Sequence, residues 1–306
     1  MLVLVAGATG NIGKNLIEKL VARDHQVRCL SRNPSKLDPS LHEQLESFVQ
    51  SDNYYDIPAL DRACHGVDAI VCAYAALPEL QLDGQLLLLR AAERAGVTKF
   101  VAASWNYDWR HMKLGEHEVY DPYISFRSHA EMSSPIKPVY ILTGVFAEVL
   151  FCVPGNAPYS TAHNGVWCPE NKRMEVWGSG DEIWHWTTEA DAAEYTVAVL
   201  EHKDAAKGGL WSVCSGANSL RELSSIYGTV RDRHVDVVVK GSAEELRATA
   251  DEARQRCGAK KFWEYIGYFV QLYTIEETWV LKDIDNSKLD VQPTTFGEFL
   301  QQYPEV

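Results

Sequence analysis

The sequence predicts an α/β fold in which a doubly wound parallel sheet, covered by helices on both faces, is followed by a smaller C-terminal α/β lobe. Three observations predict this fold. Over roughly the first half of the chain, short apolar runs of strand length alternate with segments of helical periodicity. A turn rich in glycine joins the first apolar run to the first helical segment. After about residue 150 the alternation stops, and loops rich in Pro, Asn, Gly and Trp take its place.

The chain begins with a strand–helix–strand unit. Residues 2–6 (LVLVA) form an unbroken apolar run, which a strand requires when helices cover both of its faces. Ile12, Leu16 and Leu20 then recur every four residues, the spacing of one helix face. A second apolar run follows at 26–31 (QVRCLS). Two strands joined through a helix lie parallel in one sheet, so this unit indicates a parallel architecture.

The same alternation continues to about residue 144. Further strands are expected at 46–50, 67–75, 98–104 and 138–144, and a leucine-rich helix at about 82–95. Another helix is expected to begin at Asp121 and Pro122 and to end near Ser134, because Pro is favoured in the first helical turn. Together these segments predict at least six parallel strands.

The C-terminal half adds new elements and one helix that returns to the sheet. A β-hairpin is expected over 173–186 (RMEVWGSGDEIWHW), because two strand-like runs flank a Gly-Ser-Gly turn. Residues 187–202 carry Ala192, Tyr195 and Val199 on one helical stripe. This helix is therefore expected to pack back onto the sheet.

Composition limits the partners and the compartment. The chain has 306 residues, enough for a large α/β domain with a smaller lobe, and a formal net charge of −13 without a basic run. That charge repels a phosphate backbone, so nucleic acid is not expected as a partner. The seven cysteines are scattered, and the first residues form neither a signal peptide nor a membrane span. A cytoplasmic protein without a membrane segment is expected, as a monomer or homodimer.

The glycine-rich turn has the position of a dinucleotide-binding loop. Gly7, Gly10 and Gly13 directly follow the first strand and open the first helix, in the pattern G-x-x-G-x-x-G. Gly7 permits the tight turn, Gly10 lets the backbone approach a pyrophosphate, and Gly13 allows the helix to pack closely on the strand. The N–H groups at the start of the helix attract phosphate oxygens. The alternative is an ordinary loop of small residues, but the strand–turn–helix context favours a nucleotide site.

The end of the second strand indicates which nicotinamide cofactor binds. An NAD site usually has Asp or Glu there to hold the ribose 2′-hydroxyl. This chain has Arg32 and Lys36 instead, two cations that suit a 2′-phosphate. NADP(H) is therefore favoured, and the alternative for Arg32 is a solvated surface charge. No metal is expected, because the histidines and cysteines lack the spacings of zinc sites.

Four segments together resemble the NmrA-like and isoflavone-reductase-like group of atypical short-chain dehydrogenases/reductases. They are VAGATGNIG at 5–13, SRNPSK at 31–36, TKFVAASWN at 98–106 and TTEADAAEYTVAVL at 187–200. The resemblance covers nearly the whole chain. It implies a Rossmann-type NADP(H)-binding domain, a substrate cleft beside a C-terminal lobe, and a place in secondary metabolism. The predicted division is a cofactor domain at 1–150, with 187–215 packing back onto it, and a substrate lobe at 151–186 and 216–306.

The resemblance also implies cofactor-binding residues, position by position. Those expected at the phosphates and the adenosine ribose are Gly7, Thr9, Gly10, Asn11, Ile12, Gly13, Arg32 and Lys36. Those expected after the fourth strand are Ala73 and Tyr74. Those expected near the second ribose and the nicotinamide are Ser104, Trp105, Asn106, Thr143, Val145 and Phe146.

Residues 120–127 (YDPYISFR) occupy the helix on which reductases of this class typically carry a lysine, often as Tyr-x-x-x-Lys. Tyr123 and Arg127 have that spacing, with arginine in place of lysine. In the catalytic interpretation, Arg127 keeps the positive charge and so can still stabilise a tyrosinate or contact the ribose. Arginine retains its proton at ordinary pH, however, so a proton relay of the lysine type is not expected. His129 is a further candidate acid or base. The alternative is structural: Arg127 pairs with Glu131, Tyr123 stacks on the guanidinium, and His129 supports the helix.

Aromatic side chains are frequent in two loop-rich segments. They are Tyr107, Trp109, His111, Tyr120, Trp167, Trp184, His185 and Trp186. As a group they suit either a flat, conjugated ligand or the core of a loop-rich lobe.

The favoured function is an NADPH-dependent reductase of a small aromatic or polyketide-type metabolite. Hydride is expected from the nicotinamide beside Phe146, and the proton from Tyr123, His129 or water. Two other functions are compatible with the sequence. One is an NADP(H)-binding redox sensor without turnover, suggested by the missing lysine. The other is a non-redox isomerase, dehydratase or cyclase on the same scaffold.

Overall fold

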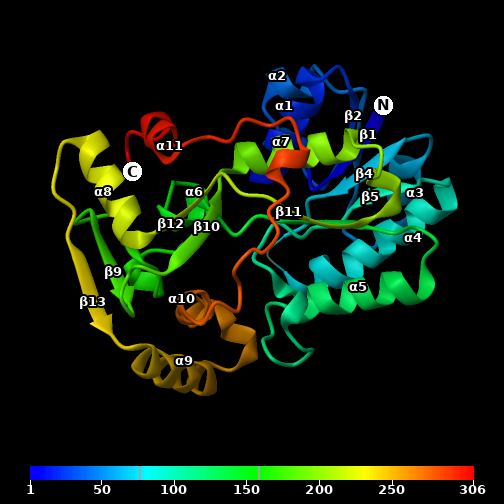
Figure 1. Cartoon of the computed structure of the whole chain (residues 1–306). Helices are drawn as coiled ribbons and strands as arrows, with labels where there is room; N and C mark the ends of the chain where they lie inside the picture. The colour runs from blue at the N-terminus through cyan, green and yellow to red at the C-terminus, as the bar shows by residue number, and fades with distance from the viewer. Residues whose placement is uncertain (76, 158) are drawn as a thin grey trace.

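The computed structural model describes residues 1–75, 77–157 and 159–306, and its central element is a seven-stranded parallel sheet. The strands are β1 (Leu2–Ala6), β2 (Gln26–Ser31), β3 (Ser47–Gln50), β4 (Ala69–Cys72), β5 (Lys99–Val101), β6 (Val139–Leu142) and β11 (Gly209–Ser212). Their spatial order is β11-β6-β5-β4-β1-β2-β3, and every neighbouring pair is parallel (Figure 1). The predicted doubly wound sheet is confirmed, and β11 adds a seventh strand to the six segments expected.

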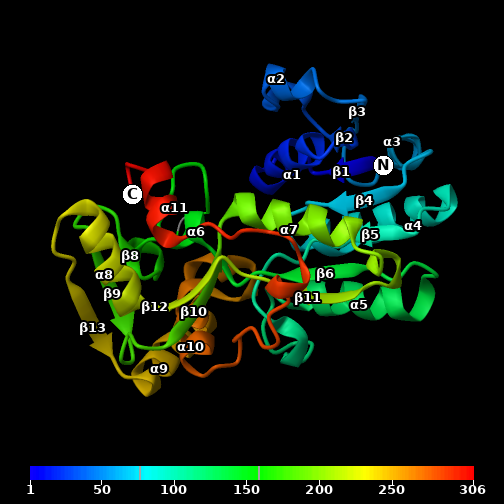
Figure 2. The ribbon, with the colours of Figure 1, turned by 45° about the horizontal axis from the view of Figure 1, so that its top comes forward.

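Helices cover both faces of this sheet. They are α1 (Asn11–Ala22), α3 (Ile57–Cys64), α4 (Gln85–Ala95), α5 (Asp121–Ser133) and α7 (Glu189–Glu201). Because alternate strand residues point to opposite faces, Val3 and Val5 pack with α1 and α7, whereas Leu4 and Ala6 belong to the core with α3, α4 and α5. Figures 1 and 2 show α1 and α7 on one side of the sheet and α4 and α5 on the other. The helix expected over 187–202 is α7, which lies beside α1.

The strand order reverses at β1 and β4, which lie side by side although β2 and β3 separate them in the chain. Open parallel sheets bind ligands at such a reversal, in the crevice beyond the carboxyl ends of the strands. The segments that follow β1, β4, β5 and β6 all emerge at this edge. The sheet therefore brings together residues 7–13, 73–81, 102–107 and 143–146.

The helix expected at 82–95 has an additional π-helical turn, η2 (Leu80–Gly84), directly before α4. Gln85 is 2% exposed and holds this turn. Its amide nitrogen donates to the Gln81 carbonyl at 3.0 Å, and its amide oxygen accepts the Ala103 N–H at 2.6 Å. π-Turns are rare and are frequent at functional sites. This one connects the segment after β5 to Gln81, at the crevice.

The C-terminal lobe contains two three-stranded sheets, of order β12-β10-β7 and β13-β9-β8. Their strands are β7 (Val145–Phe146), β8 (Trp167–Cys168), β9 (Arg173–Trp177), β10 (Ile183–Thr187), β12 (Gly216–Ser219) and β13 (Val237–Gly241). The helices that follow β7 outside the main sheet are α6 (Ala147–Leu150), α8 (Leu220–Arg231), α9 (Ala243–Cys257), α10 (Ile266–Ile275) and α11 (Phe296–Gln302). A short helix, α2 (Pro39–His42), lies between β2 and β3 of the main sheet. The short helical turns are η1 (Pro34–Lys36), η3 (Trp109–His111), η4 (Thr161–His163), η5 (Ala205–Lys207), η6 (Ala259–Glu264) and η7 (Asn286–Lys288).

The hairpin predicted over 173–186 is wrong. β9 pairs with β8 and β13, whereas β10 pairs with β7 and β12. In the connection, Gly178 and Gly180 have φ of +73° and +79°, and Glu182 accepts the N–H groups of Ser179 and Gly180. The turn therefore closes on its own carboxylate and leads the chain into a different sheet. Apolar alternation indicates that a segment is a strand, but it does not indicate which strand becomes its partner.

Candidate functional site

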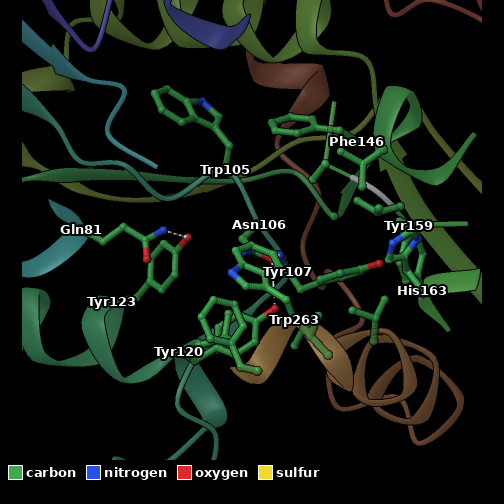
Figure 3. A pocket seen from close by; sticks show the side chains of 18 of the residues that line it. Gln81, Trp105, Asn106, Tyr107, Tyr120, Tyr123, Phe146, Tyr159, His163 and Trp263 are labelled. Atoms are coloured by element: carbon green, nitrogen blue, oxygen red, sulfur yellow. Dashed lines mark hydrogen bonds between the residues drawn. The ribbon is translucent and has the colours of Figure 1, made fainter. Parts of the chain in front are cut away.

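Two cavities lie at the carboxyl edge of the main sheet. The glycine-loop cavity, of about 450 Å³, lies over the turn after β1 and the ends of β2 and β4. The aromatic cavity, of about 220 Å³, lies between the segments after β5 and β6 and the C-terminal lobe (Figure 3). One segment contributes to both, since Leu77 and Leu80 line the first cavity and Pro78 and Gln81 line the second. This arrangement suits an extended ligand whose end meets a second, smaller molecule.

At two of the three loop positions, Gly7 and Gly13, a larger residue would clash with neighbouring backbone atoms. Gly7 has φ of +85°, and a Cβ there would lie 2.5 Å from the Ala73 carbonyl oxygen. A Cβ on Gly13 would lie 2.4 Å from the Gly7 carbonyl oxygen. Gly10 differs, because its Cβ would meet only the Gly7 oxygen, at 3.4 Å. The open side of Gly10 is therefore where a ligand can approach the backbone.

The first turn of α1 offers N–H groups to such a ligand. Gly10 is its N-cap and supplies no capping side chain. The first N–H groups of a helix have no partner within the helix and attract anions. Asn11, the first helical residue, turns its amide to the Asn156 oxygen at 2.8 Å. The start of α1 therefore fits a pyrophosphate, as a dinucleotide cofactor would require.

A cationic edge closes the other end of the glycine-loop cavity. Arg32 and Lys36 line it, and neither makes a salt bridge within the described ranges. Thr9 and Ser31 share a hydrogen bond of 2.8 Å between their hydroxyls across the floor. Two cations at the end of β2, where NAD sites have a carboxylate, fit a ribose 2′-phosphate.

The aromatic cavity has a polar corner formed by Tyr123, Gln81, Asn106 and Tyr120. The Gln81 amide nitrogen donates to the Tyr123 hydroxyl at 2.9 Å, and the Tyr120 hydroxyl donates to the Asn106 amide oxygen at 3.0 Å (Figure 3). Burial raises the pKa of Tyr123, while hydrogen bonding by Asn106 and Gln81 lowers it. Tyr123 is therefore a neutral phenol held in place at physiological pH, able to donate a proton.

The rest of this cavity is apolar or aromatic. Figure 3 shows Tyr159 and His163 on the side opposite Gln81 and Tyr123. The apolar lining comes from Pro78, Val119, Val145, Phe146, Val149, Ala157, Phe262, Ile266 and Val270. Within the described part of the chain, no Asp, Glu, Lys or Arg lines it. The cavity therefore suits a neutral ring system with polar substituents.

Most of the residues expected at a cofactor line one of the two cavities. Those in the glycine-loop cavity are Gly7, Thr9, Gly10, Arg32, Lys36, Ala73 and Tyr74. Those in the aromatic cavity are Trp105, Asn106, Val145 and Phe146. The position of Trp105 is fixed by a residue outside the cavity, since its indole nitrogen donates to the Thr196 hydroxyl at 3.0 Å.

Five of the expected residues line neither cavity. Ile12 packs against a core cluster, and Asn11 and Gly13 lie in the first turn of α1. Ser104 is 1% exposed, and its hydroxyl accepts the Ile141 N–H at 2.7 Å, which joins the segment after β5 to β6. Thr143 is fully buried, and its N–H donates to the Asn106 carbonyl at 2.9 Å. Ser104 and Thr143 support the cavity wall from behind.

The helix α5 places Tyr123 in the aromatic cavity but not Arg127 or His129. Arg127 pairs with Glu131 at 2.7 Å, which is the structural alternative for that residue. The His129 Nδ1 lies 2.9 Å from the Ser125 carbonyl oxygen, on an exposed part of the helix. Neither side chain lines either cavity. Tyr123 does not stack on the guanidinium as that alternative expects, since it packs against Trp109 and Tyr120.

The aromatic residues divide between ligand cavity and core. Tyr107 and Tyr120 line the aromatic cavity. Trp109, Trp167, Trp184, Trp186 and His185 are buried outside it, and His111 is exposed. Other lining residues had no sequence signal: they are Gln81, Tyr159, His163, Phe262 and Trp263. Their positions depend on how the lobe packs over the sheet, which local patterns do not encode.

A buried carboxylate, Glu148, and a half-buried one, Glu189, lie beside the glycine loop. Both oxygens of Glu148 accept the Glu189 N–H at 3.1 Å, and the Glu189 carboxylate lies 3.4 Å from the Asn11 amide nitrogen. Burial, and then the charge of Glu189, raises the pKa of Glu148 to about 8. Burial raises the pKa of Glu189 to about 7. The native protein therefore retains protons here that the unfolded chain releases near pH 4 to 5.

This pair is expected to make stability fall as pH rises. Because the native state binds more protons than the unfolded state, the free energy of unfolding decreases between roughly pH 4.5 and pH 8. Glu148→Gln keeps an acceptor for the Glu189 N–H but removes the charge. It is expected to raise the free energy of unfolding by roughly 2–4 kcal/mol at pH 8, and by less than about 1 kcal/mol at pH 5. Urea denaturation at the two pH values measures this difference, and an equal gain at both contradicts the assignment.

Comparison with known proteins supports the resemblance seen in the sequence. A bifunctional pinoresinol-lariciresinol reductase of Linum usitatissimum is 26% identical over 211 residues, which cover 65% of this chain and 64% of that protein. The matched region thus spans slightly less than two thirds of that relative's length. The solved structure "AtPrR2 with NADP+ and (+)pinoresinol" matches with a TM-score of 0.75 and 18% identity, over 98% of each chain.

A second solved structure, the binary complex of leucoanthocyanidin reductase and NADPH from Vitis vinifera, has a TM-score of 0.77 and 19% identity over 99% of each chain. At this identity the two structures show a shared fold. A model of the NmrA-like family matches residues 1–300, nearly the whole length. The chain therefore belongs to the NmrA-like family.

Proposed function

We propose that the protein is an NADPH-dependent reductase of a small, neutral, aromatic metabolite. One observation carries the proposal: a glycine loop with a cationic edge adjoins an aromatic cavity that contains a buried phenol, Tyr123, and that no Asp, Glu, Lys or Arg among the described residues lines. Related structures support it, since the solved proteins of similar fold include complexes with NADP+ and with NADPH. The missing lysine does not argue against it, because Tyr123 has other hydrogen-bonding partners.

The residues divide the work between binding and proton transfer. Gly10 and the first turn of α1 would hold the pyrophosphate, and Arg32 with Lys36 would hold the 2′-phosphate. The cofactor, when bound, supplies hydride to the substrate. Phe146 and Val145 exclude water from the reacting end of the aromatic cavity, and Tyr123 donates the proton.

The proposal is tested by measuring NADPH consumption by the purified protein in the presence of a panel of aryl enones, quinones and aryl ketones. Steady consumption with at least one of these compounds supports a reductase. Tight NADPH binding without consumption contradicts it and favours a sensor. A product that forms while NADPH stays constant also contradicts it and favours a non-redox reaction.

Cofactor preference depends on Arg32. Arg32→Glu removes a cation and places a carboxylate where NAD sites carry one. It is expected to weaken NADPH binding by roughly 100-fold while leaving NADH binding within about threefold. Calorimetric titration with both nucleotides checks this. An equal loss for NADPH and NADH contradicts the role of Arg32 at the 2′-phosphate.

A cytoplasmic location is also proposed. All seven cysteines are free thiols, as a reducing compartment would maintain them. None of the helices in the described ranges is both long enough and apolar enough to cross a membrane.

A further inference from the structure

We propose that Gln81 and Asn106 take the place of the lysine that reductases of this class carry, by donating hydrogen bonds to the Tyr123 oxygen as it becomes a phenolate. The inference rests on the proposed function. It makes Tyr123 the catalytic acid and the two amides positioning residues. It also accounts for a tyrosine that keeps its place in the cavity although Arg127 points to another partner.

The amide of Gln81 is held in the orientation that this role requires. Its nitrogen lies 2.9 Å from the Tyr123 hydroxyl oxygen and donates to it. The backbone of Gln81 is anchored on both sides, since its N–H donates to the Leu77 carbonyl at 2.9 Å and its carbonyl accepts from Gln85 at 3.0 Å. The buried Gln85 in turn binds Ala103. The hydrogen bonds of the π-turn therefore fix the backbone from which the Gln81 amide reaches Tyr123.

The amide of Asn106 is oriented by its oxygen. That oxygen accepts the Tyr107 N–H at 2.8 Å and the Tyr120 hydroxyl at 3.0 Å. The Asn106 carbonyl accepts the N–H groups of Thr143 and Gly144, at 2.9 and 3.2 Å. Four bonds thus fix this residue, and its amide nitrogen is left to donate into the cavity. Within the described residues that nitrogen makes no hydrogen bond of regular geometry, but Asn106 acts with Gln81 to lower the pKa of Tyr123, so the Tyr123 oxygen is the partner that the orientation favours.

The chemistry of this corner matches proton donation. The hydroxyl of Tyr123 accepts from Gln81, and it donates no hydrogen bond within the described part of the chain, so its proton is available to a ligand. During reduction its O–H bond breaks, the proton goes to the substrate, and the electron pair stays on the phenolate. NADPH supplies the two electrons of the reduction in the proposed function. Two neutral amides then hydrogen-bond the phenolate in a cavity that no lysine or arginine of residues 1–75, 77–157 and 159–306 lines.

The first test measures the Tyr123 acidity without turnover. Tyr123 is replaced by 3,5-difluorotyrosine, whose more acidic phenol is titrated by its phenolate absorbance in the protein without nucleotide. Gln81→Met, which cannot donate, is expected to move the midpoint upward by about one pH unit. Gln81→Glu has the same shape and is expected to move it further, because of its charge. Gln44→Met, on the exposed surface, is the control. An unchanged midpoint in both Gln81 variants overturns the proposal.

The second test is a double-mutant cycle on kcat with whichever compound the panel identifies. Gln81→Met is expected to lower kcat about tenfold when Tyr123 is present and to have no effect in a Tyr123→Phe background. A merely structural role for Gln81 predicts the same loss in both backgrounds, and that result overturns the proposal. If the protein consumes no NADPH with any compound, the proposed function fails, and the titration alone still decides what Gln81 does.

Discussion

Tyr123→Phe is expected to lower kcat for NADPH-dependent reduction by at least about 100-fold, while the affinity for NADPH stays within about twofold. Of the two phenols in the polar corner, Tyr120 already donates its proton to Asn106, whereas Tyr123 only accepts a hydrogen bond and keeps its proton for a substrate. Phe retains the packing against Trp109 and Tyr120, so the loss is a loss of chemistry and not of folding. Steady-state kinetics and calorimetric titration of the variant measure the two quantities.

A matched control is available on the same helix. His129→Ala changes the other candidate acid, whose side chain lies outside both cavities. It is expected to leave kcat within about twofold. A large loss in His129→Ala together with a small loss in Tyr123→Phe would reverse the assignment of the proton donor.

Gly10→Ala and Gly13→Ala are expected to separate nucleotide binding from folding. At Gly10 the added Cβ meets only one atom, at 3.4 Å, so the protein folds with a stability within about 1 kcal/mol of the original. The methyl group occupies the path by which a pyrophosphate approaches the backbone. NADPH affinity is therefore expected to fall by roughly 100-fold in a folded protein, as calorimetry and urea denaturation together will measure.

Gly13→Ala has a different consequence. Its Cβ would lie 2.4 Å from the Gly7 oxygen and 2.8 Å from two backbone atoms of Ala8, so the helix must move away from the strand. The free energy of unfolding is expected to fall by roughly 3 kcal/mol, and nucleotide binding falls with it.

The Gly10→Ala variant decides where the pyrophosphate binds. If this variant keeps its full NADPH affinity, the pyrophosphate does not approach the backbone at Gly10.

The part of the fold that the sequence predicts is the part encoded locally. The unbroken apolar runs of β1 and β4 are buried on both faces, and their burial follows directly from covering helices. The Asp121–Pro122 start of α5 likewise agrees with the structure, because the constraint of proline acts within one turn. The hairpin prediction failed since strand partners depend on distant residues, and the Glu182 turn directs β10 to a second sheet.

The candidate site follows the same rule. The glycine loop and Arg32 are recognisable because each occupies a fixed place after a strand. Gln81 was not recognisable, because its role depends on a π-turn held by a buried glutamine. His163 and Trp263 reach the aromatic cavity only through the packing of the lobe. Arg127 has the expected spacing from Tyr123, but it pairs with Glu131 one turn further along α5 and does not line the aromatic cavity, which the spacing alone could not predict.

We propose that one NADP(H) molecule extends from the Arg32 edge, over the glycine loop, to the aromatic cavity. A crystal structure of the protein with NADP+ tests it most directly. We expect the 2′-phosphate to lie against Arg32 and Lys36, the pyrophosphate at Gly10, and the nicotinamide within reach of Tyr123. Density for the nucleotide elsewhere, or a glycine loop without nucleotide at saturating NADP+, would show that these residues do not form the cofactor site.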